Sequence, residues 1–405
     1  MPLKLLVLFV HVDNRDAFRV PELESVATLF KSSITFNTFP SVHRPFAWVS
    51  FESLEVAQSI CERCVMVQTI LEVYSQGDSF ESMLNNLLES HQNNTLHPTL
   101  QQVILPTSTF KFTHMPWGKK YTQKEQIKMM DLIGDSLDFK GQVDLLNPIF
   151  DLWINCLFPS DNSSPQFFFG RSIGISLRKH VFQFRLPTRS FLGPTSMDAE
   201  LSFLMANLTL VQKYDFVFDP FVGTASTLIP ITFLGAFPIG ADLDQSVLID
   251  WKNSIKGPKC HVNFDQYELP YPEIIHADVC HVPFTKHSLD AVVCDPPYGI
   301  KAGSRGDVGG RRKSKHGDEK RLKLGHNRVK LHDFHAVDPL KLIESMLVNI
   351  FELLKPGKRV CYWLPQEDCV NLDPPIISGF KLVHDCLQPC TSVFNRRLIV
   401  LQKMV

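Results

Sequence analysis

The stretch "YDFVFDPFVGTAST", Tyr214–Thr227, decides the fold. Its first half is a short apolar run that stops at an acidic residue, Asp219, and its second half opens a helical pattern, "GTASTLIPITFLGA". A buried strand that turns directly into a helix is typical of an α/β sheet. Gly223 lies in the turn between them, where the absence of a side chain lets a ligand approach the backbone. We therefore expect a strand, a ligand-facing turn and a helix in this stretch.

The same alternation of strands and helices continues to the end of the chain. Helices are expected at "QSVLIDWKNSI" and "DPLKLIESMLVNIFELL", and further strands at "FPIGADLD", "YPEIIHADV", "SLDAVVCDPPYG", "KRVCYWLP", "GFKLVHDCL" and "RRLIVLQKM". Continuous apolar runs separated by helices predict a mostly parallel sheet that is covered on both faces. The last two runs are joined by a connection too short for a crossover helix, so they should pair antiparallel. The prediction is a seven-stranded, mostly parallel α/β sheet with an antiparallel last strand.

The first part of the chain has a different pattern, which predicts an α+β fold. We expect a strand at "PFAWVSF", a helix from Glu55 to Tyr74, another strand at "TFKFTHM" and a surface loop at 159–166. The expected division is an N-terminal region at 1–170, a linker at 171–195 and a C-terminal domain at 196–405.

Composition places the chain among ordinary globular proteins. Hydrophobic residues make up 44% of its 405 residues, charged residues 20%, and the formal net charge is -1. No run approaches the roughly 18 apolar residues of a membrane span, and the opening apolar run lacks a signal-peptide cleavage pattern. We therefore expect a cytoplasmic protein with reduced cysteines and no membrane partner. Cys61 and Cys64 form a C-x-x-C without a second pair, so no metal site is predicted.

Four acidic residues each follow an apolar run of the C-terminal part: Asp219, Asp242, Asp278 and Asp295. In an open α/β sheet, ligands bind beyond the carboxyl ends of the strands. One such acid alone is commonly a turn former or helix N-cap, as we interpret Asp244. Four in order suggest a nucleoside site, in which Asp242 accepts ribose hydroxyls and Asp278 accepts an adenine amino group. No G-x-G-x-x-G follows the first strand, which disfavours a dinucleotide and points to S-adenosylmethionine.

The motif "DPPY", Asp295-Pro296-Pro297-Tyr298, supplies what methylation of a nucleobase amine requires. Such an amine is a poor nucleophile because its lone pair is delocalised into the ring. Asp295 and the carbonyl group of Pro296 can accept its two N–H groups, and the two prolines make the turn rigid. Tyr298 offers a face on which an extruded base can stack. A second Asp-Pro-Pro, at Asp373, is followed by isoleucine and is interpreted as structural.

A basic segment follows this motif directly. Residues 301–330 contain 11 Lys and Arg residues and three acidic residues, a local balance of +8, together with several glycines. The plain alternative is a solvated, flexible insertion. Its position behind the base-binding turn favours contacts with nucleic-acid phosphates, for which the candidates are Arg305, Arg311, Arg312 and Lys313.

The segments "DPFVGTAST", "GADLD" and "CDPPYGI" resemble the amino-methyltransferases of class I, Rossmann-like architecture. Three further segments are similar to the tRNA guanosine N2-methyltransferases that act at position ten, and to the amino-terminal half of that family's eukaryotic catalytic subunit: "RSFLGPTSMDAELSFLMANLTLV", "RPFAWVSFESLEVAQSICERCVMVQTILEVYSQGDSF" and "FKGQVDLLNPIFDLWI".

This resemblance implies an N-terminal half with a THUMP domain, an RNA-binding module, and N2-methylguanosine in tRNA as the product. It also implies a heterodimer with a small zinc-binding activator subunit. The residues that it assigns to catalysis are Asp295, Pro296, Pro297 and Tyr298. Those that it assigns to S-adenosylmethionine are Thr195, Ser196, Met197, Asp219, Phe221, Gly223, Thr224, Asp242, Asp278, Val279 and Asp295.

Two alternatives stay open. A DNA adenine or cytosine amino-methylase would also carry the "DPPY" motif, but it should have a base-recognition insertion in place of the amino-terminal half. A non-catalytic RNA-binding scaffold would keep the fold and is expected to lose the acidic residues of the pocket, all four of which are present.

Overall fold

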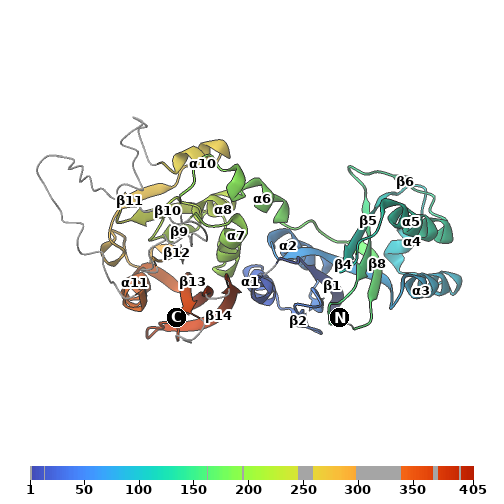
Figure 1. The fold of residues 1–405 in the computed structure, drawn as a ribbon, viewed down its shortest axis with the longest axis horizontal. Coiled ribbons are helices and arrows are strands. Elements are labelled where there is room, and N and C mark those ends of the chain that lie inside the picture. Colours follow the sequence, from blue (N-terminus) through green and yellow to red (C-terminus); the bar gives the residue numbers. More distant parts are fainter. Residues whose placement is uncertain are drawn as a thin grey trace, which may run out of the picture.

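The computed structural model consists of two lobes that lie side by side along its long axis (Figure 1). It describes residues 2–12, 14–161, 163–193, 196–244, 259–297, 339–367, 373–391 and 394–405. Within these residues, the N-terminal lobe is built on a sheet of eight strands and the C-terminal lobe on a sheet of seven.

The sheet of the N-terminal lobe has the order β2-β3-β1-β4-β8-β7-β5-β6. Its strands are β1 (Leu3–Phe9), β2 (Thr35–Phe36), β3 (Phe46–Phe51), β4 (Val67–Gly77), β5 (Thr109–Trp117), β6 (Gln142–Val143), β7 (Phe150–Leu157) and β8 (Gln166–Ser172). Its helices are η1 (Asp16–Phe18), α1 (Arg19–Leu29), α2 (Leu54–Arg63), α3 (Phe80–Gln92), α4 (Pro98–Val103) and α5 (Gln123–Leu137).

The pleat of this sheet separates two apolar clusters. On β1, Leu5 and Val7 pack with residues of α1 and α2, whereas Leu6 and Leu8 belong to the cluster on the other face. On β7, Trp153 points to that second face and lies with Phe168 of β8. Because neighbours along a strand point to opposite faces, one strand supplies both clusters.

The helix expected from Glu55 to Tyr74 is wrong in its second half. Helix α2 ends at Arg63, Cys64 has extended backbone angles, and β4 begins at Val67. Strand β4 pairs with β1 on one side and β8 on the other, so it lies inside the sheet. The apolar residues Val67, Ile70, Leu71 and Tyr74 stand at positions i, i+3, i+4 and i+7 of this strand, so they imitate the spacing of a helix. The strands expected at "PFAWVSF" and "TFKFTHM" are confirmed as β3 and β5.

The sheet of the C-terminal lobe has the order β11-β10-β9-β12-β13-β15-β14. Its strands are β9 (Phe216–Asp219), β10 (Phe237–Asp242), β11 (Glu273–His276), β12 (Leu289–Cys294), β13 (Leu354–Glu367), β14 (Phe380–Pro389) and β15 (Phe394–Lys403). Strands β9 to β13 pair in parallel, whereas β15 is antiparallel to both of its neighbours, β13 and β14. The seven-stranded, mostly parallel sheet with an antiparallel last strand is confirmed.

Helices cover both faces of this sheet, as a parallel sheet requires. The described helices are α6 (Arg178–Gln183), η2 (Leu186–Thr188), α7 (Ala199–Leu208), α8 (Leu228–Phe233), α10 (His261–Gln266), η3 (Val279–His281) and α11 (Pro339–Leu353). One apolar cluster packs α7 and α8 against the sheet, and a second packs α11 against the other face. The helix expected at "QSVLIDWKNSI" and capped by Asp244 lies outside the described residues.

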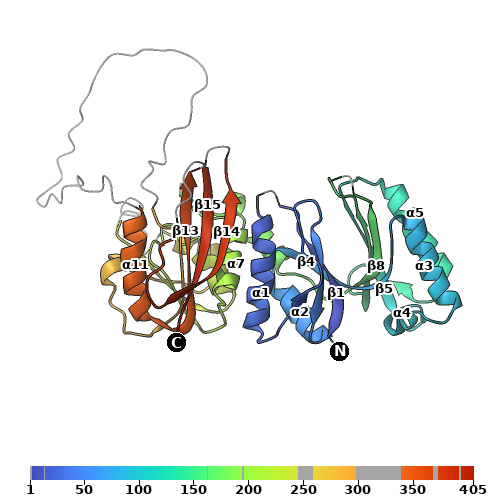
Figure 2. The ribbon, with the colours of Figure 1, turned by 90° about the horizontal axis from the view of Figure 1, so that it is seen from below.

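Helix α7 lies where the two lobes meet, next to α1 (Figure 2). All ten residues of α7 are buried. Phe18, Val65 and Met66 of the N-terminal lobe belong to the same apolar cluster as Leu204 of α7 and Trp363 of β13. Arg15 adds a cross-lobe ion pair to Glu200 at 2.6 Å. The apolar core therefore runs without a break from one lobe into the other.

The helices and the C-x-x-C cysteines can be compared with what the composition predicts. None of the described helices has the length and apolar character that a membrane crossing needs. Cys61 in α2 and Cys64 at its C-terminal end are fully buried in one apolar cluster, and burial raises the pKa of the Cys61 thiol to about 12. These thiols therefore pack as apolar side chains.

Candidate active site

Four acidic residues meet at one edge of the C-terminal sheet. Asp219 is the last residue of β9 and lies opposite Gly240 of β10, two residues before Asp242. On the other side of β9, strand β12 ends at Cys294, directly before Asp295. On the outer side of β10, Asp242 pairs with His276, two residues before Asp278. Parallel pairing thus brings the four strand ends together.

Asp219 is buried and organises the turn that follows it. Its Oδ1 accepts a hydrogen bond from the backbone N–H of Phe221 at 3.0 Å, and its Oδ2 accepts one from the Thr227 hydroxyl. The pKa of Asp219 is raised to about 7, chiefly by burial and in smaller part by the nearby carboxyls of Asp242 and Asp295, while the two hydrogen bonds act in the opposite direction. Its side chain is 1% exposed, so it stabilises the turn through these buried hydrogen bonds and does not face solvent.

Gly223 and Asp242 connect that turn to the neighbouring strand. The backbone N–H of Gly223 donates to Asp242 Oδ2 at 3.0 Å, and the N–H of Asp244 donates to Oδ1 at 2.9 Å. Gly223 has φ +48°, in the left-handed region, and the nearest atom to the position of an added Cβ is 3.9 Å away. The turn thus has a backbone shape that favours glycine, and open space above it.

The segment before α7 reaches the same turn. The Ser196 hydroxyl lies 2.9 Å from the Thr224 hydroxyl and accepts the backbone N–H of Gly193 at 2.9 Å. The Thr224 hydroxyl is also 2.8 Å from that of Ser226. Met197, next in sequence, is buried in the core. Ser196 and Thr224 therefore fix this segment against the turn after β9.

Asp278 is the N-cap of η3, and its Oδ1 accepts the backbone N–H of Cys280 at 2.9 Å. Its side chain is 48% exposed, in contrast to that of Asp219. Val279, the next residue, is buried, and partly buried Phe221 packs in the same apolar cluster. An exposed carboxylate next to apolar side chains is suited to one edge of a planar heterocycle.

Asp295 faces a residue that the sequence analysis missed. Arg396, the third residue of β15, has its Nη1 3.7 Å from Asp295 Oδ2, and its guanidinium lies over the ring of Trp363 at 4.0 Å from the ring centroid. Pro296 is buried and Pro297 is exposed. The two adjacent arginines in "RRLIVLQKM" were a usable signal, because an antiparallel last strand begins at the edge where the parallel strands end.

Six predicted site residues lie outside the described parts of the chain: Thr195, Tyr298, Arg305, Arg311, Arg312 and Lys313. In the second Asp-Pro-Pro, the carbonyl group of Pro375 accepts a hydrogen bond from the buried Tyr362 hydroxyl at 2.8 Å. This contact fits the structural role expected of that motif. Among the described residues, no three His, Cys, Asp or Glu side chains are grouped as a metal site would require.

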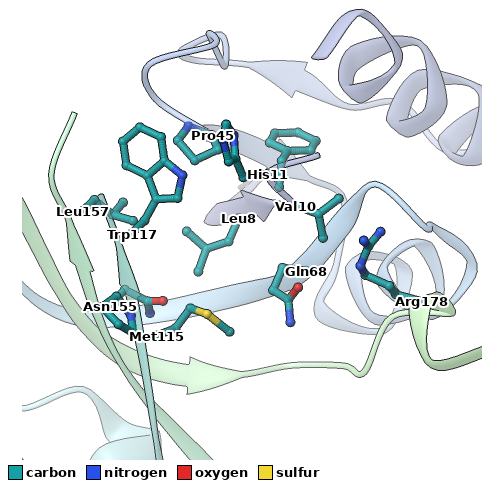
Figure 3. Close-up of a pocket in the computed structure, with 12 residues that line it drawn as sticks. Leu8, Val10, His11, Pro45, Gln68, Met115, Trp117, Asn155, Leu157 and Arg178 are labelled. Atoms are coloured by element: carbon teal, nitrogen blue, oxygen red, sulfur yellow. The ribbon is translucent and has the colours of Figure 1, made fainter. Parts of the chain in front are cut away.

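A separate cavity of about 280 Å³ lies in the N-terminal lobe, between the ends of β1, β5 and β7 (Figure 3). Its walls include Leu8, Met115 and Trp117, and Arg178 lies at one side. Asn155 also borders it, is fully buried, and has no hydrogen-bond partner for its amide in the described structure. The polar side chains of His11 and Gln68 also line the cavity, so its walls combine apolar and polar surface.

Known protein families match both lobes. Residues 4–178 match the family model of the Tmrp11 THUMP N-terminal domain, and residues 187–312 match that of the RMKL-like methyltransferase domain. The fold and the acidic strand ends thus define a Rossmann-like methyltransferase joined to a THUMP-containing N-terminal lobe.

Curated relatives extend the match over nearly the whole chain. The human tRNA (guanine(10)-N(2))-methyltransferase TRMT11 is 30% identical over 413 residues, which cover 96% of this chain and 86% of the human protein. The TRMT11 of Dictyostelium discoideum is 30% identical over 438 residues, 99% of this chain and 82% of the relative. TrmN from Thermus thermophilus, a solved structure, is 18% identical, covers 99% of this chain and all of its own, and has a TM-score of 0.45. The chain belongs to the TRMT11 family of tRNA (guanine(10)-N(2))-methyltransferases.

Proposed function

We propose that this protein transfers a methyl group from S-adenosylmethionine to the exocyclic N2 amine of guanosine 10 in tRNA. Family membership over nearly the whole chain supports the reaction and the substrate. The observation that carries the proposal is the set of acidic strand ends at one edge of the sheet, with Asp295-Pro296-Pro297 following β12.

The described residues fit the cofactor. The open space at Gly223 admits a ligand against the backbone. Asp242 already accepts two backbone N–H groups, but each carboxylate oxygen has a second lone pair, so it can also accept ribose hydroxyls. Asp278 is exposed and can accept an adenine amino group above Val279 and Phe221. In this proposal Thr195, Ser196, Met197 and Thr224 close over the methionine end of the cofactor. Asp219 stabilises the turn after β9 through its hydrogen bonds to Phe221 and Thr227.

The protein's own residues contribute to the reaction by binding and orienting the guanine amine. S-adenosylmethionine supplies an electrophilic methyl group when bound. Asp295 and the carbonyl group of Pro296 accept the two N–H groups of the guanine amine, which directs its lone pair out of conjugation. Transfer forms the bond between N2 and the methyl carbon while the bond from that carbon to the sulfonium sulfur breaks. S-adenosylhomocysteine is the leaving group, and the amine releases one proton to Asp295 or to solvent. Pro297 keeps the turn rigid, and Tyr298 stacks on the base.

The tRNA is held by two further parts of the chain in this proposal. The THUMP-containing lobe, 1–170 in our division, contacts the tRNA body, and 171–195 join it to the catalytic domain. The basic segment at 301–330 contacts phosphates near the target through Arg305, Arg311, Arg312 and Lys313. A small zinc-binding activator subunit binds the catalytic domain, as the family resemblance implies, and the heterodimer acts in the cytoplasm.

The test is a methylation assay with purified chain and unmodified tRNA, with and without the activator subunit. Labelled S-adenosylmethionine is the donor, and the product is digested to nucleosides. The expected product is N2-methylguanosine that disappears when guanosine 10 is replaced by adenosine. Label on another nucleoside or on DNA, or no label even with the activator, would contradict the proposal.

A further inference from the structure

The sheet topology places Arg396 at the edge where the parallel strands end. Strand β15 is antiparallel to β13, and Arg396 pairs with Pro365 near the end of β13. The beginning of β15 therefore lies at the same edge as the ends of the parallel strands. A side chain from the last strand can in this way reach Asp295, which comes 101 positions earlier in the sequence.

Three contacts fix the orientation of the Arg396 guanidinium. Its plane stacks on the fully buried ring of Trp363 at 4.0 Å. Its Nε donates a hydrogen bond to Gln388 Oε1 at 2.8 Å, and Gln388 is itself buried. Its Nη1 faces Asp295 Oδ2 at 3.7 Å, with 17% of the arginine side chain and 24% of the aspartate exposed. A planar guanidinium can make these three contacts at once, which a lysine ammonium cannot.

The stacking platform is itself anchored from the other lobe. Phe18 of the N-terminal lobe packs edge-on against Trp363, with ring centroids 6.1 Å apart. Both rings lie in the apolar cluster that spans the lobes. Rotation of Trp363 would disturb this core, so the platform beneath Arg396 is rigid.

The charges around Asp295 show what the guanidinium contributes. Asp219 and Asp242 are acidic neighbours at the same edge, and the Cys294 thiol precedes Asp295 in the chain. Several carboxyls close together disfavour one another's ionised forms. The positive charge of Arg396 offsets this repulsion at Asp295, the acid to which the proposed function assigns the target amine.

We propose that Arg396 is a positioning residue for the methyl transfer. It holds Asp295 ionised and in one orientation, so that the carboxylate can accept an N–H of the guanine amine. This inference rests on the proposed function. Pairing with Arg396 leaves acceptor capacity on the carboxylate, because its two oxygens have about four lone-pair positions.

The test compares three variants of the full chain with its activator: Arg396→Met, Arg396→Lys and the control Arg397→Met. Arg397 is adjacent but points to the other side of β15, where its Nε donates to Asp385 Oδ1 at 2.9 Å. The pH dependence of kcat on tRNA is measured from pH 5.5 to 9, together with KM for tRNA, S-adenosylmethionine affinity by calorimetry and the unfolding temperature.

For Arg396→Met, we expect the acidic limb of the pH profile to move upward by about one pH unit, because loss of the cation makes Asp295 protonate more readily. The effect should appear in kcat, with KM and cofactor affinity nearly unchanged. Arg396→Lys should return the limb towards its original position at a lower plateau, and Arg397→Met should resemble the wild type.

An unchanged limb in Arg396→Met, or an equal shift in Arg397→Met, overturns the inference and leaves the proposed function standing. If Arg396→Met does not fold, the profile of Arg396→Lys decides: a wild-type limb with a reduced plateau supports the inference, and a wild-type plateau overturns it. A wild-type chain that methylates no tRNA overturns the proposed function and the inference with it.

Discussion

Glu22 of the N-terminal lobe accepts a hydrogen bond of 2.7 Å from the side-chain amide of Asn207 in α7. The same carboxylate accepts the backbone N–H groups of Val65 at 2.8 Å and Met66 at 2.7 Å. The amide oxygen of Asn207 accepts a bond from Arg63 Nε at 2.7 Å. All of these groups lie in or beside the apolar core that spans the lobes, so the junction is held by satisfied buried polar groups. We expect the two lobes to unfold as one unit.

This junction should depend on pH. Burial raises the pKa of Glu22 from 4.5 to about 7, although its hydrogen bonds act in the opposite direction. Between these two values the folded state keeps a proton that the unfolded chain releases. The contribution of Glu22 to the unfolding free energy is therefore complete below pH 4.5, falls as the pH rises to about 7, and is constant above.

Glu22→Gln removes this titration. The difference in unfolding free energy between wild type and Glu22→Gln should fall by on the order of 2–3 kcal/mol between pH 5 and pH 8. Urea unfolding of both proteins across this range measures it. The control Glu24→Gln alters a carboxyl on the same helix with no such network. Parallel pH curves for wild type and Glu22→Gln would contradict the expectation.

The features that could be predicted from the sequence are those that depend on residues close together along the chain. Asp219, Asp242 and Asp295 each follow an apolar run, and parallel pairing alone is enough to place them at one edge. The contacts of Glu22 with Asn207 and of Arg396 with Asp295 join residues 185 and 101 positions apart, and no local pattern encodes such pairs. The sequence also could not show that the Asp219 side chain is buried. An acid that stabilises a turn and an acid that faces a ligand both directly follow an apolar run, so their sequence patterns are the same.

Replacement of Gly223 should weaken cofactor binding. Gly223→Ala places a methyl group in the open space above the turn and forces alanine into the left-handed region, at a cost of about 1 kcal/mol. We expect the dissociation constant for S-adenosylmethionine to rise by roughly tenfold, since 1.4 kcal/mol of lost binding corresponds to that factor. Calorimetry measures it.

Gly357→Ala is the matched control. Gly357 in β13 has φ +78° and likewise no neighbour near an added Cβ, so it carries the same backbone strain away from the acidic edge. Both variants should lose similar thermal stability, and only Gly223→Ala should lose affinity. Equal cofactor affinity in the two variants would show that the turn does not face the ligand.

The two Asp-Pro-Pro motifs offer a direct comparison. Asp295→Asn removes the charged acceptor for the amine and should lower the methylation rate by about a hundredfold or more. Asp373→Asn should leave the rate unchanged, because that motif packs against Tyr362 through the carbonyl group of Pro375. Single-turnover assays with saturating cofactor distinguish the two. A similar loss of rate in both variants would contradict the assignment of the target amine to Asp295 alone.

The basic segment should set the salt dependence of tRNA binding. Each phosphate contact that is lost lowers the slope of log K against log salt concentration by about 0.7–0.9. Replacing Arg311, Arg312 and Lys313 by glutamine should therefore weaken binding at low salt and flatten the slope by about two units. The charge-retaining control, Arg311→Lys with Arg312→Lys, should keep most of the slope, because counterion release depends on charge and not on guanidinium geometry. Filter binding from 50 to 300 mM salt measures both quantities. A glutamine variant with the wild-type slope would show that these three residues make no phosphate contacts.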